Sequence, residues 1–384
     1  MKFKVNTAVA AKNYAVMLRL WGEKGIEKIP HGDTINYLLE RMTPKEIGAI
    51  RTRMVKELIR RKCFQNGRLV GYYLIAIDGS RIFSFKARHC EKCLTQKTGD
   101  GKVTYFHPVL EAKLVAADGM ALSVETEFIE NPGARVFDKQ DCELKAFYRL
   151  AEKLKNRFPQ LAICLLLDGL YPSKRVFSIC QDYRWKYLIT FKEGSMPEVY
   201  REYQDLKWLS LQMRHPRNQL VETRRDDGVK QTHTWIEAID YAEDFLNVLE
   251  CEEEKGGKTT RFVWLTNFSM TQNNCQKLAC GARLRWRIEN EGFNVQKNGG
   301  YGLEHAYSHD PNAMKNFYLM LQMAHTIMQL MERGNLFEGS VVKIYGSLKN
   351  FAEKLLIALT TELLKLKDMT ILLSRRIQIR LNTS

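Results

Sequence analysis

The chain has 384 residues, of which 45% are hydrophobic and 27% charged, so it is long enough for a large core and more than one domain, with the composition of a soluble globular protein. Its net charge of +15 and pI near 9.3 favour a polyanionic partner, nucleic acid first, although a merely soluble basic protein has the same balance. The N-terminus lacks the apolar run of a signal peptide, and no stretch approaches the ~18 apolar residues of a membrane span. Together with an odd number of cysteines, nine, this predicts reduced thiols, a cytoplasmic location and no membrane partner.

Residues 30–62 predict helices with a clear start signal. Thr43 is a natural N-cap, Pro44 suits the first helical position, and Glu46 completes a capping box. The basic residues 60–62 suit a helix C-terminus or a phosphate backbone, and capping and dipole effects alone explain them.

The segment 69–78, LVGYYLIAID, predicts a buried strand that ends at Asp78 and is followed by Gly79 and Ser80. An acid at the end of a buried strand is exposed at the rim of the sheet and can bind a metal ion. An Asp-Gly pair is equally common in hairpin turns. From this residue alone, both interpretations stay open.

Residues 84–116 predict a strand, a loop and a second strand, with potential zinc ligands in and near the loop. These are His89, Cys90, Cys93 and, further along, His107. However, His89 adjoins Cys90, His107 is distant in sequence, and no second Cys-x-x-Cys follows. Ordinary reduced thiols near a hairpin are therefore favoured over a structural zinc site.

A second buried strand, LAICLLLD, ends at Asp168 and follows an amphipathic helix predicted over residues 139–156. A helix between two buried strands is a crossover, which indicates a mixed α/β sheet. Residues 177–194 predict a further helix and strand. Residues 195–275 are β-rich and predict an insertion, in which Trp235 and Trp264 suit a core position better than stacking on an extruded base.

The segment 283–305, RLRWRIENEGFNVQKNGGYGLEH, predicts a helix that carries a third acid. At about 100° per residue, Arg285, Glu289, Gly292 and Gln296 share one stripe, and Trp286 and Phe293 share another. A surface helix with an ordinary Arg/Glu pair, which contributes a few tenths of a kcal/mol, is the alternative.

The order R-W-x-I-E, followed by Phe, Lys and a glycine-rich exit, resembles the helix with the last acid of the DDE transposases of bacterial insertion sequences, in the Tyr-Arg-Glu-Lys signature group. In that group the arginine precedes the glutamate by four residues, as Arg285 precedes Glu289. The apolar strand ending in D-G-S at Asp78, the strand ending at Asp168 and the β-rich insertion extend the resemblance over residues 65–335. It implies an RNase H-like mixed sheet flanked by helices, with the β-rich insertion between the second and third acids.

Three features depart from the signature. The lysine expected seven residues after Glu289 falls on Gln296, and Lys297 comes one residue later. Phe293 is shifted by one as well, so one extra residue near Gly292 is expected, for example in a π-bulge. Ala282 stands where the signature has tyrosine. The shift also makes Glu291, paired with Arg287, a rival third acid, although Glu289 matches the motif in full.

The resemblance implies a transposase that cuts element ends and joins them to target DNA. Asp78, Asp168 and Glu289 would bind two Mg²⁺ ions, with Mn²⁺ as a substitute, because close carboxylates repel one another without a cation. The same resemblance places Arg285 and Lys297 on the DNA backbone; Gln296 and Trp264 are further DNA-binding candidates. Its partners would be double-stranded terminal repeats and target DNA, bound by a homodimer in the bacterial nucleoid.

The predicted parts are an N-terminal helical region at 1–66, the catalytic core at 67–194 and 276–335, the insertion at 195–275, and a C-terminal helical region at 336–384. Two other functions stay open. One is an RNase H-like nuclease without strand transfer. The other is a truncated, inactive, element-derived DNA-binding protein, since only 77 residues precede the first acid, Asp78.

Overall fold

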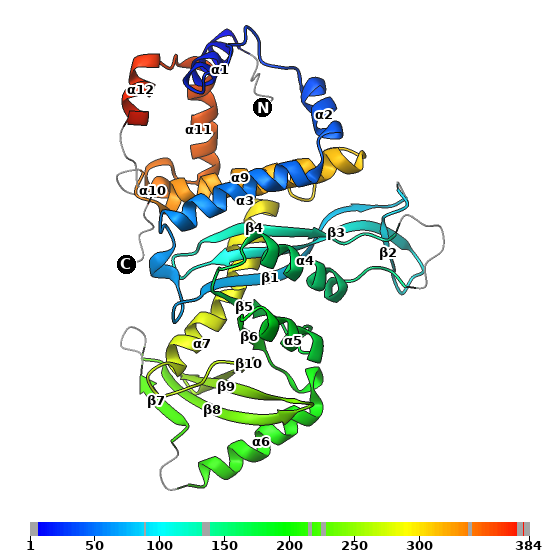
Figure 1. Ribbon diagram of the computed structural model, residues 1–384, viewed down its shortest axis with the longest axis vertical. Helices are drawn as coiled ribbons and strands as arrows, with labels where there is room; N and C mark the ends of the chain where they lie inside the picture. Colours follow the sequence, from blue (N-terminus) through cyan, green and yellow to red (C-terminus); the bar gives the residue numbers. More distant parts are fainter. Residues whose placement is uncertain are drawn as a thin grey trace. The chain divides into compact units, whose positions relative to one another are not determined.

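The computed structural model describes residues 7–87, 90–132, 139–213, 217–223, 228–336, 340–374 and residue 379. The chain divides into two compact units. One unit is built from residues 65–294 around a β-sheet. The other is helical and combines residues up to 64 with those from 295 onward (Figure 1).

The sheet unit contains one mixed sheet with the strand order β2-β3-β1-β5-β6-β10-β9-β8-β7, and β4 pairs with β3. The pairs β1/β5 and β5/β6 are parallel, and the others are antiparallel. The strands are β1 (Tyr73–Phe85), β2 (Leu94–Lys97), β3 (Val103–Val115), β4 (Ala121–Phe128), β5 (Ile163–Leu167), β6 (Lys186–Thr190), β7 (Gln219–Thr223), β8 (Lys230–Tyr241), β9 (Asp244–Lys255) and β10 (Lys258–Thr266). The predicted mixed α/β class is confirmed.

Helices flank this sheet: α4 (Glu143–Arg157), α5 (Lys174–Asp182), α6 (Pro197–Leu211) and α7 (Cys275–Arg283) (Figure 1). The predicted crossover helix is α4, whose buried apolar stripe includes Phe147, Leu150 and Leu154. It leads into β5, whose five residues are all buried. Short 3₁₀ turns lie at 65–67, 193–195 and 284–286, and residues Ile288–Asn294 form a π-helical segment.

Strand β1 does not end at Asp78, as the sequence pattern suggested, but continues to Phe85. Strand β3 pairs with β1 from Ile75 to Phe85, so Asp78, Gly79 and Ser80 keep an extended partner. The hairpin interpretation of Asp78-Gly79 is therefore wrong. The apolar run stops at Asp78 because burial stops there: Tyr73 to Ile77 are buried, and the next three residues are partly exposed.

The predicted β-rich insertion contains β7 to β10 together with α6. It does not form a separate sheet, because β10 pairs with β6 and so extends the sheet that holds the two aspartates. In Figure 1 the strands β8, β9 and β10 lie side by side, with α6 packed along β8.

The helical unit contains α1 (Ala8–Leu20), α2 (Gly32–Arg41), α3 (Pro44–Arg60), α8 (Val295–Asn298), α9 (Pro311–Arg333), α10 (Val341–Tyr345), α11 (Leu348–Thr361) and α12 (Leu366–Ser374). The predicted capping box of Thr43 and Glu46 is present. The amide of Asn316 in α9 donates to the carbonyls of Leu39 and Met42, at 2.8 and 2.7 Å. Such bonds join the N- and C-terminal helical regions, which the sequence analysis treated separately, into one unit. Throughout the described ranges, the helices are too short or too polar to cross a membrane.

Candidate active site: an acidic cluster where β5 ends

Asp78 and Asp168 lie at the same level on two adjacent parallel strands. The register pairs Ala76 with Leu166, and the same offset separates the two aspartates (166 − 76 = 168 − 78 = 90). Strand β5 ends at Leu167, so Asp168 follows its last residue. Neighbouring strands are about 4.8 Å apart, and residues at one level point to the same face. The register therefore brings Asp78 and Asp168 to neighbouring positions where β1 loses its neighbour β5. Glu143 and Tyr171 link the two aspartates, because each of them interacts with the charges of both.

Glu289, the third predicted acid, reaches the same place from the π-helical segment, which packs against β1, β3 and β4. Its Oε1 accepts an ion-paired hydrogen bond from Nη1 of the largely buried Arg285, at 2.8 Å. The predicted Arg285–Glu289 pair is thus present. The rival acid, Glu291, instead pairs with Arg287, which also donates to the carbonyl of Ala117 at 3.2 Å.

The π-helical geometry expected near Gly292 is present, because residues 288–294 form π-helix. Ile288 and Phe293, five residues apart, are both buried, as this wider turn allows. The predicted shared stripe of Trp286 and Phe293 is wrong: Trp286 is 54% exposed and Phe293 is 5% exposed. A 3₁₀ turn followed by π-helix changes the angular spacing on which that prediction depended.

Glu143 is a fourth carboxylate that the sequence analysis missed. It is the first residue of α4, and its Oε1 accepts a hydrogen bond of 2.6 Å from the hydroxyl of Tyr171. It lies so close to β1 that a Cβ added to Gly79 would be 2.5 Å from its Oε2. The available signal was only an acid in the first turn of a predicted helix, which the helix dipole alone explains.

The pKa values of these groups show that their charges interact. Burial, the charge of Glu289 and the charge of Glu143 raise the pKa of Asp78 to about 7, while Arg285 opposes the shift. Burial also raises the pKa of Glu143; the hydrogen bond from Tyr171 opposes this shift, and the charge of Asp168 adds to it. Burial and the nearby acids keep the pKa of Tyr171 far above its usual value, so its hydroxyl stays a donor. The cluster has more negative charge than its surroundings neutralise.

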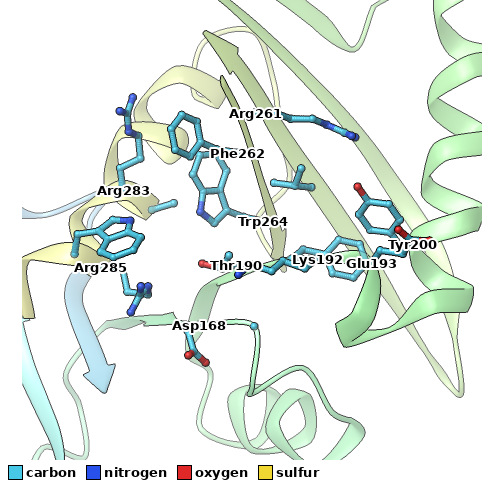
Figure 2. Close-up of a pocket in the computed structure, with 15 residues that line it drawn as sticks. Asp168, Thr190, Lys192, Glu193, Tyr200, Arg261, Phe262, Trp264, Arg283 and Arg285 are labelled. Carbon is cyan, nitrogen blue, oxygen red and sulfur yellow. The ribbon is translucent and has the colours of Figure 1, made fainter. Parts of the chain in front are cut away.

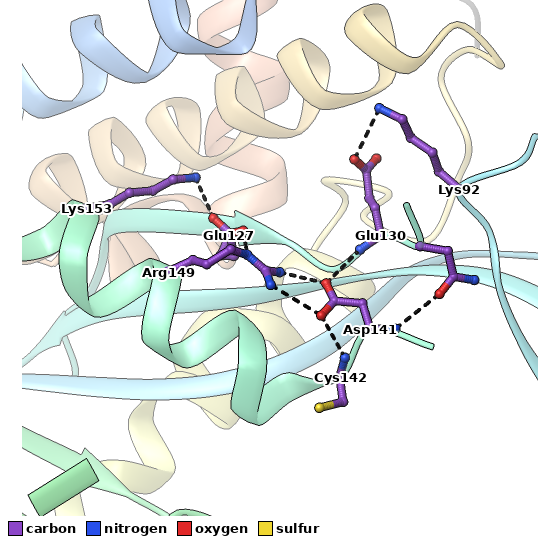
Figure 3. Close-up of polar contacts among 8 residues, drawn as sticks. Lys92, Glu127, Glu130, Asp141, Cys142, Arg149 and Lys153 are labelled. Carbon is purple, nitrogen blue, oxygen red and sulfur yellow. Dashed lines mark hydrogen bonds and ion pairs between the residues drawn. The ribbon is translucent and has the colours of Figure 1, made fainter. Parts of the chain in front are cut away.

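A polar network holds the start of α4, and therefore Glu143, in place (Figure 3). The carboxylate of Asp141 accepts from Arg149 Nη2 at 2.6 Å and from the backbone N–H of Cys142 at 3.0 Å. Arg149 and Lys153, one helical turn apart on α4, both pair with Glu127 of β4. The segment before α4 is thus fastened to the helix and to the sheet.

A cavity of about 470 Å³ adjoins the acidic cluster and is lined by Asp168 and Arg285 together with residues of β6, β10, α6 and α7. Figure 2 shows Arg283 and Arg285 on one side and Lys192, Glu193 and Tyr200 on the other. The guanidinium of Arg283 lies 4.6 Å from the ring centroid of Phe262. The cavity therefore has a cationic and aromatic wall next to the carboxylates.

The remaining candidates take other positions. Trp264 is 4% exposed and stacks on Phe262, with ring centroids 6.0 Å apart, so it fits the core role favoured for it while lining the cavity. Gln296 belongs to the helical unit, where it is fully buried and its amide nitrogen bonds to Gln322 and His325. Because this side chain is fully buried, the prediction that Gln296 contacts DNA is wrong.

Lys297, in the same unit, pairs with Glu304 at 3.0 Å.

A comparison with known proteins gives no family: no family model matches the chain, and no curated protein sequence matches it.

Proposed function

We propose that the chain is a DDE-type DNA transposase with an RNase H-like catalytic core. The observation that carries the proposal has two parts: adjacent parallel strands carry Asp78 and Asp168 at the same level, and Glu289 of the π-helical segment is close enough for its charge to act on Asp78. An arginine four residues before the glutamate pairs with it, as the signature implies.

The donor set fits Mg²⁺. All the converging side chains are carboxylates, which are the hard oxygen ligands that Mg²⁺ prefers. Burial first, and then the charges of Glu289 and Glu143, raise the pKa of Asp78, and a bound divalent cation would oppose this shift. Two bound Mg²⁺ ions, for which Mn²⁺ substitutes, would supply activation of a water or a 3′-hydroxyl and stabilisation of the leaving oxygen at phosphorus.

The chain's own groups supply the rest. Arg285 neutralises part of the carboxylate charge and presents a planar fork suited to phosphate. Tyr171 donates to Glu143 and so directs that carboxylate toward Asp78 and Asp168. Along the cavity wall, Lys192 and Arg283 offer phosphate contacts for a DNA strand that enters beside Asp168. The substrates are double-stranded element ends and target DNA, acted on by a homodimer.

The experiment is Mg²⁺-dependent nicking and strand joining of DNA that carries the element's own flanking ends. Glu289→Gln and Glu291→Gln are a matched pair, because each removes a carboxylate that pairs with an arginine four residues earlier. We expect cleavage to be lost in Glu289→Gln and kept in Glu291→Gln. Loss in Glu291→Gln alone would move the third acid by two residues.

Two other outcomes identify the competing functions. Cleavage without joining of the resulting 3′-hydroxyl to a target would indicate an RNase H-like nuclease. Tight DNA binding without cleavage by the unmodified protein would indicate an inactive, element-derived DNA-binding protein.

A further inference from the structure

Cys90, Cys93 and His107 form a second cluster of potential metal ligands, away from the acids. The two sulfur atoms are 3.4 Å apart, and Nε2 of His107 is 3.3 Å from Sγ of Cys90 and 3.4 Å from Sγ of Cys93. Both cysteines are reduced. His89, the fourth residue considered in the sequence analysis, lies outside the described residues.

Strand pairing explains why His107 lies next to Cys93 and Cys90, which precede it by 14 and 17 positions in the sequence. Leu94, the first residue of β2, pairs with Phe106 of β3. Continuing this antiparallel register by one residue places Cys93 opposite His107, and Cys90 returns to the same point through the short loop. The sequence analysis favoured ordinary thiols because His107 is distant from the cysteines in sequence. The strand register nevertheless brings these side chains together in space.

The cluster is largely buried and its loop is held in place. Cys93 is fully buried, His107 is 3% exposed, and Cys90 is half-buried. The side-chain amide of Asn131 donates to the carbonyl of Cys93 at 2.8 Å, and its backbone N–H donates to the carbonyl of Lys92 at 3.1 Å. The loop between the two cysteines is thus fixed in a shape that directs both thiols toward His107.

We propose that Cys90, Cys93 and His107 bind a structural zinc ion. Two thiols and an imidazole are the soft and intermediate donors that select Zn²⁺ over Mg²⁺. A tetrahedral zinc, with bonds near 2.3 Å to sulfur and 2.1 Å to nitrogen, holds such atoms about 3.6–3.8 Å apart, within about half an ångström of the observed distances. A water or another donor takes the fourth position.

The zinc site would have a structural role, because it lies away from the acids and is linked to them only through hydrogen bonds and a shared strand. His107 lies four residues along β3 from Glu111, the partner of Asp78, which is about 13 Å at the rise of a strand. Asn131, which holds the zinc loop, also accepts from the backbone N–H of Asp141 at 3.1 Å, two residues before Glu143. The metal would therefore fix residues 90–93 and, through Asn131, the segment that leads into α4.

The test is the metal content of the purified full chain and the spectrum of its Co²⁺ form. We expect one zinc per chain and a thiolate-to-cobalt charge-transfer band, both lost in Cys93→Ser and in His107→Ala. Cys280→Ser, which changes an exposed cysteine, and Asp168→Asn, which changes the acidic cluster, are expected to keep both. Zinc lost in Asp168→Asn and kept in Cys93→Ser would assign the metal to the acids and overturn the proposal.

Two further measurements remain decisive if a variant fails to fold. His107→Cys replaces one zinc ligand by another and is expected to keep the metal. Removing zinc from the unmodified protein with a chelator is expected to lower its Tm, and adding Zn²⁺ to restore it. A chain purified under reducing conditions without zinc, or with a Cys90–Cys93 disulfide in place of metal, would overturn the proposal.

Discussion

The acidic cluster and the Cys90/Cys93/His107 cluster lie in the same sheet unit but differ in position, ligand type and burial. The acids come from β1, the end of β5, α4 and the π-helical segment, and the thiols and imidazole come from the loop before β2 and from β3. The acids are hard donors with unneutralised charge beside a cavity. The thiols and imidazole are softer, largely buried and held by Asn131. A repulsive cluster beside a cavity suits ions that turn over with a substrate, whereas a largely buried cluster suits an ion that stays. The comparison teaches that one sheet can gather hard and soft donors in two separate places, which suit the two different metal ions that we propose.

The largest expected effect comes from removing a carboxylate from the first cluster alone. Asp168→Asn should reduce Mg²⁺-dependent DNA cleavage by about a thousandfold or more, because a metal ligand is worth several kcal/mol in the transition state. Single-turnover cleavage at saturating protein measures it, and the zinc content reports whether the second cluster is intact. Cleavage at the unmodified rate would remove Asp168 from the site.

The Glu143→Gln variant tests whether Glu143 supports the three predicted metal ligands rather than binding the metal itself. The amide keeps the size of the side chain and its bond to Tyr171 but removes a charge that raises the pKa of Asp78. We expect cleavage to fall about 10–100-fold, as for groups that support metal ligands. The acidic limb of the pH–rate profile should move to lower pH. A purely structural role for Glu143 would leave that limb in place.

Gly79→Ala perturbs the same carboxylate by crowding. The added Cβ would be 2.5 Å from Oε2 of Glu143, the far end of a flexible side chain, so the carboxylate turns aside at little cost in stability. We expect cleavage to fall by up to about tenfold, with the free energy of unfolding changed by less than about 1 kcal/mol. Gly99→Ala is the matched control, because nothing lies within 4 Å of its added Cβ. Equal cleavage by the two variants would contradict the close approach of Glu143.

A further effect is on stability rather than on cleavage, and it depends on pH. Asp78 has its pKa raised from 3.8 to about 7, so the folded chain binds more protons than the unfolded chain between these values. Its contribution to the free energy of unfolding therefore falls as pH rises, by at most about 1.4 kcal/mol per pH unit. Urea unfolding at pH 5 and pH 7, with chelator, measures this slope. Asp78→Asn should flatten the slope, and Mg²⁺ should restore stability at the higher pH; equal slopes in both proteins would contradict it.

Local patterns in the sequence led to the site residues that we propose. Asp78 and Asp168 were proposed because each follows a buried apolar run, and Glu289 because R-W-x-I-E is contiguous. The extra residue of the π-helical segment was found from the displaced Phe293 and Lys297. In each case the signal lies within a few residues of the group that it identifies.

The other features of the two clusters and of the sheet depend on contacts between residues that are distant in sequence. Glu143 looks like any acid in a first helical turn, and only the packing of α4 on the sheet brings it to Gly79. His107 meets Cys93 through a strand register that residue types did not specify. The sheet continues through β10 because β10 pairs with β6, and no pattern within the insertion predicted that partner.

The register of β1 with β5 also bears on how the chain tolerates insertions and deletions. Four residue pairs, from Tyr73 with Ile163 to Ala76 with Leu166, set the relative heights of Asp78 and Asp168. The connection between the strands does not enter this alignment, so its loops can lengthen or shorten while the aspartates stay level. A single residue gained or lost within β5 would instead turn Asp168 to the opposite face of the sheet. The site is therefore robust to large changes in its loops and fragile to the smallest change in one five-residue strand.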